Sequence, residues 1–75
     1  MRVQVRLAGH LSRDGRSRNV TVEVDSGATV ADLIATLGIP SGEVGTVYLD
    51  GKGAFHNAFL HEDSRVELFP PIAGG

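Results

Sequence analysis

The sequence of 75 residues has no cysteine and no tryptophan, and its aromatic residues are one tyrosine and three phenylalanines. Without cysteine, the chain can form neither a disulfide framework nor a thiolate metal site. Its start, Met1-Arg2-Val3-Gln4-Val5, alternates in polarity and lacks the continuous apolar run of a signal peptide. We therefore expect a cytoplasmic protein.

An excess of one charge and long apolar runs are also lacking. Seven Lys and Arg residues stand against nine Asp and Glu residues, and the basic residues are scattered, which argues against a nucleic-acid partner. No apolar run is as long as a transmembrane helix, so no membrane partner is expected. Since 75 residues provide room for one modest core, the sequence predicts a single small domain and not a complete multi-step enzyme.

The first part of the chain shows a period of two. Aliphatic and polar residues alternate in two stretches, separated by a polar loop over 12–19 that contains Asp14-Gly15. Such alternation predicts two half-buried strands, and the short connection favours an antiparallel hairpin. The aliphatic positions are Val3, Val5, Leu7, Val20, Val22 and Val24.

One short amphipathic helix is predicted next. Thr29 can cap it, and Asp32 falls in its first turn. Gly38 suits the left-handed position after the last turn, and Pro40 prevents continuation. Apolar residues recur at the spacing of one helical face, at Val30, Leu33, Ile34 and Leu37.

Further strands follow the helix. Residues 46–50 predict a third strand closed by a turn at Asp50-Gly51, and residues 65–69 predict the last strand. Residues 54–60 are ambiguous and compatible with a short strand followed by a turn or a 3₁₀ segment. Pro70-Pro71 ends the last strand, because consecutive prolines remove two donors.

This order of elements is that of an α+β fold of the β-grasp type, in which a mixed sheet of four or five strands packs on one helix. In that arrangement the first and last strands lie parallel at the centre of the sheet, joined through the helix. The predicted core consists of Val3, Val5, Leu7, Val20, Val22, Val24, Val30, Leu33, Ile34, Leu37, Val47, Leu49, Leu60, Val66 and Leu68.

Residues 70–75 are expected to form a flexible tail after a domain of residues 1–69. This tail carries no charge and ends in Gly74-Gly75, so its backbone can enter a narrow site on another protein. The reactive group is the α-carboxylate of Gly75, a poor electrophile until it is activated. Since the sequence has no phosphate-binding loop, ATP and Mg²⁺ must come from a partner, and the chain itself is expected to bind no cofactor.

Two segments carry a family resemblance. Thr-Val-Ala-Asp-Leu-Ile-Ala-Thr-Leu-Gly-Ile-Pro (29–40) and Asp-Ser-Arg-Val-Glu-Leu-Phe-Pro-Pro-Ile-Ala-Gly-Gly (63–75) resemble the MoaD/ThiS family of ubiquitin-like sulfur carriers. The resemblance implies adenylation of Gly75 by an E1-like enzyme, sulfur from a donor system, and a C-terminal thiocarboxylate. One departure is Glu62-Asp63-Ser64, where the family often has Gly-Asp; it changes the turn and leaves the chemistry untouched.

The MoaD branch of the family is the small subunit of molybdopterin synthase, and the ThiS branch serves thiamine thiazole formation. The opening residues 1–7 and the long first loop resemble MoaD more, which implies the synthase large subunit as a partner. A modifier that forms isopeptides through Gly75 remains an alternative. So do a pure binding module and a merely flexible Gly-Gly tail.

A partner surface is predicted beside the tail. Strand parity places Tyr48 and Phe69 together on the open face of the sheet, with Phe69 exposed. The tail residues Pro70, Pro71, Ile72 and Ala73 complete the predicted partner-binding set.

Other polar residues have plainer explanations. His10, His56 and His61 show no metal-ligand spacing, so no metal site is expected. Capping and turn roles explain Asp32, Glu62 and Asp63. The arginines Arg13, Arg16 and Arg18 are best read as part of a solvated loop.

Overall fold

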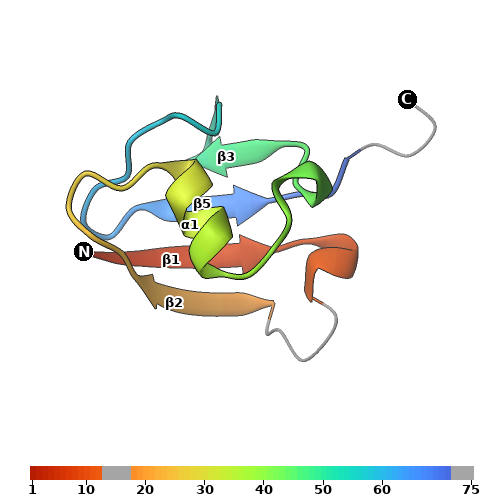
Figure 1. Cartoon of the computed structure of the whole chain (residues 1–75), viewed down its shortest axis with the longest axis horizontal. Helices are drawn as coiled ribbons and strands as arrows, with labels where there is room; N and C mark the ends of the chain where they lie inside the picture. Colours follow the sequence, from red (N-terminus) through yellow and green to blue (C-terminus); the bar gives the residue numbers. More distant parts are fainter. Residues whose placement is uncertain (13–17, 72–75) are drawn as a thin grey trace.

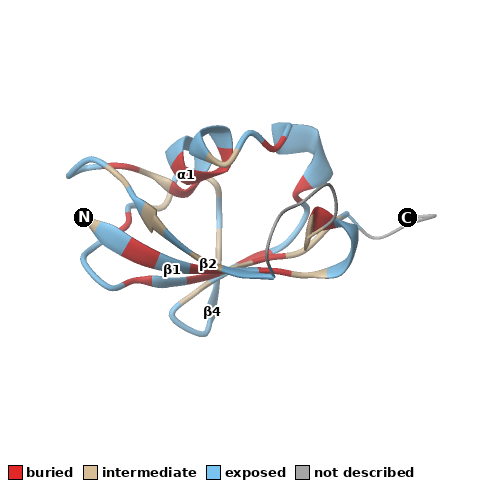
Figure 2. Cartoon of the chain, turned by 90° about the horizontal axis from the view of Figure 1, so that it is seen from below, coloured by how far each residue is buried: buried red, intermediate tan, exposed pale blue. Residues whose placement is uncertain are grey.

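The computed structural model describes residues 1–12 and 18–71. Within them, one mixed sheet has the strand order β2-β1-β5-β3-β4 (Figure 1). Its strands are β1 (Arg2–Leu7), β2 (Asn19–Glu23), β3 (Val47–Leu49), β4 (Lys52–Ala54) and β5 (Arg65–Leu68). The other elements are α1 (Val30–Thr36) and the 3₁₀ segments η1 (Gly9–Ser12) and η2 (Ser41–Glu43). Seen along the sheet, α1 lies over one face (Figure 2), which confirms the β-grasp prediction.

The strand pairing agrees with the sequence pattern. β1 pairs antiparallel with β2 and parallel with β5, so Val5 lies opposite Val20 on one side and Val66 on the other. β3 pairs antiparallel with both β5 and β4. The β3–β4 turn falls at Asp50 and Gly51, both with positive φ (51° and 85°), as a tight hairpin with right-handed twist requires.

Helix α1 begins and ends where its sequence signals predict. The Thr29 hydroxyl accepts from the Asp32 N–H at 3.3 Å, and the Asp32 carboxylate accepts from the Thr29 N–H at 2.9 Å. This capping box satisfies two N–H groups that the first turn leaves without helical partners. Gly38 follows the C-terminal cap with φ of 74°, a left-handed conformation that glycine adopts without strain.

The core lies between α1 and the sheet. Its buried apolar residues are Val3, Val5, Leu7, Leu11, Ala28, Val30, Leu33, Ile34, Ile39, Val44, Val47, Leu60, Val66 and Leu68. Burial of each large side chain contributes about 1.5–3 kcal/mol. Ser64 is the buried polar residue among those described.

The predicted core was partly wrong at its edges. Five of its members are only half-buried: Val20, Val22, Val24, Leu37 and Leu49. Strand β2 is an edge strand, and α1 has only seven residues, so the helix cannot cover the whole sheet. The connections complete the cover instead, through Leu11, Ala28, Ile39 and Val44, which the strand and helix periodicities did not identify.

Two further segments were predicted from the sequence. The ambiguous stretch 54–60 begins as the end of β4 and continues as turns, with an isolated bridge between Phe59 and Thr29. Of the predicted loop 12–19, residues 13–17 lie outside the described residues. Among the described residues, no helix is long and apolar enough to cross a membrane.

Candidate functional site

Strand β5 is followed in the sequence by Phe69, Pro70 and Pro71. The Phe69 N–H donates to the Thr46 carbonyl at 2.9 Å, and the Gly45 N–H donates to the Phe69 carbonyl at 2.8 Å. Pairing therefore continues one residue beyond β5. It stops at Pro70, because proline has no N–H to donate. We call residues 69–71 the tail root.

Two glycines flank the tail root. A Cβ added at Gly45 would lie 2.7 Å from the Pro71 Cα and 3.1 Å from the Pro70 carbonyl oxygen. Gly9 has φ of 56°, and a Cβ there would lie 3.3 Å from the Pro70 Cγ. Because β5 lies between β1 and β3, these glycines approach from opposite sides. The tail root is therefore seated between two stretches of backbone.

Tyr48 and Phe69 meet on the open face of the sheet, as strand parity predicts. Their ring centroids are 5.6 Å apart and the rings are nearly perpendicular, at 84°, an edge-to-face arrangement that aromatic pairs favour. Tyr48 is 39% exposed. Phe69 is half-buried, because the Tyr48 ring packs against it. The prediction that Phe69 is exposed was therefore wrong.

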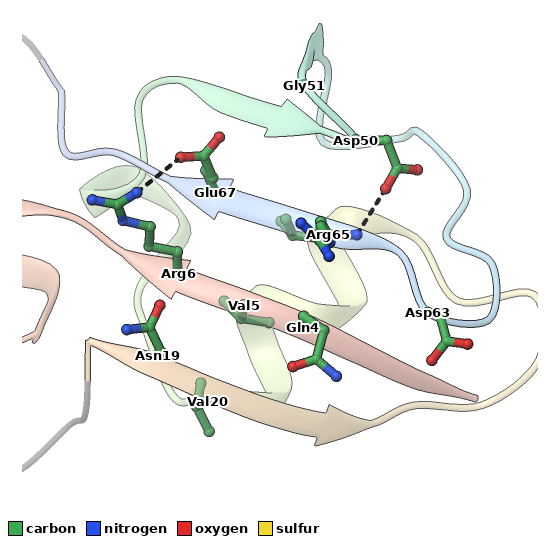
Figure 3. Close-up of a pocket in the computed structure, with 11 residues that line it drawn as sticks. Gln4, Val5, Arg6, Asn19, Val20, Asp50, Gly51, Asp63, Arg65 and Glu67 are labelled. Atoms are coloured by element: carbon green, nitrogen blue, oxygen red, sulfur yellow. Dashed lines mark hydrogen bonds and ion pairs between the residues drawn. The ribbon is translucent and has the colours of Figure 1, made fainter.

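The rest of this face is polar and shallowly hollowed. A depression of about 890 Å³ extends over β2, β1 and β5 to the β3–β4 turn (Figure 3). At one end of this depression the Arg6 Nη1 atom lies 3.9 Å from the Glu67 Oε2 atom. Arg65 and Asp50 lie toward the opposite end. Since small-molecule sites are usually concave and mostly apolar, an open hollow of mixed charge is better suited to contact with a protein.

Asp50 and His61 form an ion pair at the β3–β4 turn, with 2.8 Å between Nε2 and the carboxylate. The Arg65 main-chain N–H, donated to Asp50, lowers the pKa of Asp50 most, and the His61 ring lowers it further. The Glu62 carbonyl raises the pKa of His61 most, followed by Asp50. Because both ring nitrogens face acceptors, the doubly protonated imidazolium fits this position best.

The remaining polar candidates lie apart. His10 is exposed in η1 and His56 is half-buried after β4. In residues 1–12 and 18–71, no three His, Asp or Glu side chains lie close enough to hold a metal ion. Glu62 accepts the Arg2 main-chain N–H at 2.9 Å, and Asp63 adopts φ of 63° in its turn. The predicted turn and capping roles of the acidic residues are confirmed.

Two exposed aromatic residues were not identified from the sequence. Phe55 is 84% exposed and Phe59 is 70% exposed. The segment that carries them lies at the left of Figure 1, away from the end of β5. Residues 54–60 have no clear period, so no parity rule assigned their faces; two phenylalanines in such a segment were the available signal.

Ile72, Ala73, Gly74 and Gly75 lie outside the described residues, as do Arg13 and Arg16. Arg18 is described and exposed. The structure thus brings together Tyr48, Phe69, Pro70 and Pro71 from the predicted set.

Comparison with known proteins gives a family and a set of structural neighbours. The family described as Mut7-C ubiquitin matches residues 1–73. Among curated proteins, none matches the sequence. Small archaeal modifier protein 1 of Haloferax volcanii is similar at 29% identity with a TM-score of 0.78, covering 100% of both chains.

Two further neighbours are more distant in sequence. A Pyrococcus furiosus protein assigned as molybdopterin converting factor subunit 1 has 20% identity and a TM-score of 0.79, over 96% of this chain and 99% of that one. A complex of subunits 1 and 2 of this factor from Helicobacter pylori has 22% identity and a TM-score of 0.64, over 100% of both chains. The predicted resemblance to MoaD-type proteins is thus confirmed at the level of the fold.

Proposed function

This chain belongs to the Mut7-C ubiquitin family, and from that premise we propose that it is a sulfur carrier. In this proposal an E1-like enzyme adenylates the Gly75 carboxylate, which then becomes a thiocarboxylate. The observation that carries the proposal is the seated tail root, which the residues Ile72-Ala73-Gly74-Gly75 follow in the sequence. The chain is a substrate and carrier, and its partners supply the catalytic groups.

The chemistry needs two steps on one carbonyl carbon. A carboxylate oxygen of Gly75 attacks the α-phosphorus of ATP and pyrophosphate leaves, giving an acyl adenylate. Hydrosulfide then attacks the carbonyl carbon and AMP leaves, which gives the thiocarboxylate directly. If the sulfur arrives as a persulfide of the donor, the acyl disulfide that forms is cleaved by a thiol, which reduces it to the thiocarboxylate and forms a disulfide with the donor sulfur. ATP and Mg²⁺ are bound by the activating enzyme, because this sequence has no phosphate-binding loop. Gly74 and Gly75 carry no side chain that would obstruct a narrow active site.

The docking surface is proposed beside the tail root. The partly exposed Tyr48–Phe69 pair offers aromatic area next to the chain's exit, and aromatic residues in such positions often dominate binding energy. Pro70 and Pro71 stiffen the exit, and Ile72 and Ala73 follow the partner's channel. A stiff exit reduces the entropy lost on insertion.

Sulfur delivery to a molybdopterin precursor is the proposed pathway. The support is the fold that this chain shares with subunit 1 of the molybdopterin converting factor. One of these similar structures is a complex of subunits 1 and 2. The corresponding partner is the large subunit of molybdopterin synthase, which would receive the tail. The thiazole pathway of the ThiS branch uses the same thiocarboxylate and is the alternative within this function.

A second candidate function has its own support. The similarity to small archaeal modifier protein 1, at 29% identity over both full chains, favours a modifier that forms an isopeptide between Gly75 and a lysine of a target. The first step, adenylation of Gly75, is the same. The two functions differ in the group that finally bears the Gly75 acyl group, which is a terminal sulfur atom for a carrier and the lysine amine of a target for a modifier.

The proposal is tested by ATP-dependent adenylation with an E1-like enzyme from the same source. We expect the full chain to be adenylated and a chain lacking Gly75 not to be. Tyr48→Ala and Phe69→Ala should each raise KM for the chain about 10-fold, the loss of roughly 1.4 kcal/mol of binding. Phe55→Ala is the matched control, since Phe55 is exposed at another place. Equal KM values for all three variants would contradict the docking surface, and adenylation without Gly75 would contradict the function.

A further inference from the structure

The contact between residue 45 and the tail root is closer than any side chain would allow. A Cβ at Gly45 would lie 2.7 Å from the Pro71 Cα, 3.0 Å from the Pro71 nitrogen and 3.1 Å from the Pro70 carbonyl oxygen. Carbon atoms that are not bonded normally approach to about 3.5–4.0 Å. All three obstacles are backbone atoms, so no side-chain rotation relieves them.

The requirement for glycine at this position is one of space and not of torsion. The φ of Gly45 lies outside the left-handed region, so its conformation is open to other residues. Gly45 also donates its N–H to the Phe69 carbonyl at 2.8 Å. That hydrogen bond draws the two backbones together, and the missing side chain lets them approach.

We propose that Gly45 is a positioning residue that sets the direction in which the tail leaves the domain. The inference rests on the proposed function, because direction matters only if the Gly75 carboxylate must reach a partner's active site. A methyl group at residue 45 displaces Pro71 by roughly 1 Å, the difference between a normal carbon contact and the present distance. The fixed φ angles of Pro70 and Pro71 carry this displacement forward.

The expected effect is on the chemical step and not on docking. Misplacing a reacting group by about 1 Å can lower a rate about 100-fold. The backbone atoms that a Cβ at Gly45 would meet belong to Pro70 and Pro71, whereas docking uses the Tyr48 and Phe69 rings, which contact each other. Gly45→Ala should therefore lower kcat for adenylation by 10- to 100-fold with KM for the chain nearly unchanged.

The chain offers matched controls. Gly42 and Gly53 also lie outside the left-handed region, and a Cβ at either one would meet nothing within 4 Å. Gly42→Ala and Gly53→Ala add the same methyl group without touching the tail root, so both should keep the wild-type kcat. Chemical denaturation of each variant establishes that it folds.

A second measurement needs no enzyme. Since the sequence has no cysteine, Ala73→Cys introduces a single thiol for a nitroxide label. Paramagnetic broadening of main-chain amides then reports which parts of the domain lie near residue 73. We expect the broadening pattern to change when Gly45→Ala is added and to stay the same with Gly42→Ala.

If Gly45→Ala does not fold, Pro71→Gly takes its place, because it removes atoms and frees the tail root from a fixed φ. The kcat of Pro71→Gly should also fall, and the label at residue 73 should broaden a larger number of main-chain amides in this variant.

The outcomes separate the two claims. Wild-type kcat in Gly45→Ala, or in Pro71→Gly where the first variant is unfolded, would overturn the positioning role and leave the carrier function standing. An unchanged broadening pattern would overturn it as well. Failure of the wild-type chain to be adenylated would remove the proposed function, while the label would still decide whether Gly45 directs the tail. A lower kcat together with a changed pattern supports the positioning role.

Discussion

Removal of the Ser64 hydroxyl should destabilise the fold measurably. Ser64 is fully buried in the turn before β5, and its Oγ accepts the His61 main-chain N–H at 2.9 Å. Ser64→Ala leaves that N–H without this acceptor, which costs about 1–3 kcal/mol if water does not replace it. Since Ser64→Ala no longer buries a hydroxyl group, the saved desolvation energy offsets part of this cost. We expect the free energy of unfolding to fall by about 1–2 kcal/mol.

The assay is urea denaturation at neutral pH, with the slope on denaturant checked to be unchanged. For a domain of this size, each 1 kcal/mol lowers Tm by about 4–8 °C, so calorimetry gives an independent value. Ser41→Ala is the control, because Ser41 is exposed at the start of η2. A Ser64→Ala variant as stable as the Ser41→Ala variant would refute the role assigned to the buried hydroxyl.

Three further predictions follow from the described contacts. The Asp50–His61 pair stabilises the folded state most between pH 3.8 and pH 6.5, the ordinary pKa values of the two groups. The contribution of Asp50 to stability is lost as pH falls through its lowered pKa. The contribution of His61 is lost as pH rises through its raised pKa. His61→Gln should flatten the alkaline side of unfolding free energy against pH, and an unchanged profile would contradict the pairing. Thr29→Ala removes the helix cap and should cost about 1 kcal/mol by denaturation, whereas a cost near zero would show that the cap contributes little. Leu33→Ala, at a fully buried site, should cost about 2–5 kcal/mol, and a smaller loss by the same measurement would contradict tight packing there.

Much of the fold could be predicted because local signals agree with one another. Alternating polarity indicates strands β1 and β5. The Thr29 cap and Gly38 indicate where helix α1 begins and ends. The Asp50-Gly51 turn does so as well. Such agreement between levels is typical of sequences that specify one structure.

The connections were harder, for a physical reason. Leu11 and Val44 are buried from segments that have neither a helical nor a strand period, and their burial depends on the short α1 leaving room over the sheet. Asp63 adopts a left-handed φ; the sequence predicted a changed turn at residues 62–64 but not its conformation. Neither feature has a local pattern to read.

The candidate site divides in the same way. Parity placed Tyr48 and Phe69 on one face, but their edge-to-face contact, which half-buries Phe69, depends on strand register. The close approach of Gly45 to Pro71 joins residues far apart in the sequence. Only the three-dimensional structure shows why glycine is needed there.

The most direct test of the carrier function is mass spectrometry of the C-terminal peptide after the chain is incubated with an E1-like enzyme, ATP, Mg²⁺ and a sulfur donor. The carrier function predicts that one oxygen of the Gly75 carboxylate is replaced by sulfur, and that a chain lacking Gly75 shows no such change. An adenylate that passes to lysine without ever acquiring sulfur, or a terminal peptide unchanged by an enzyme known to be active, would contradict it.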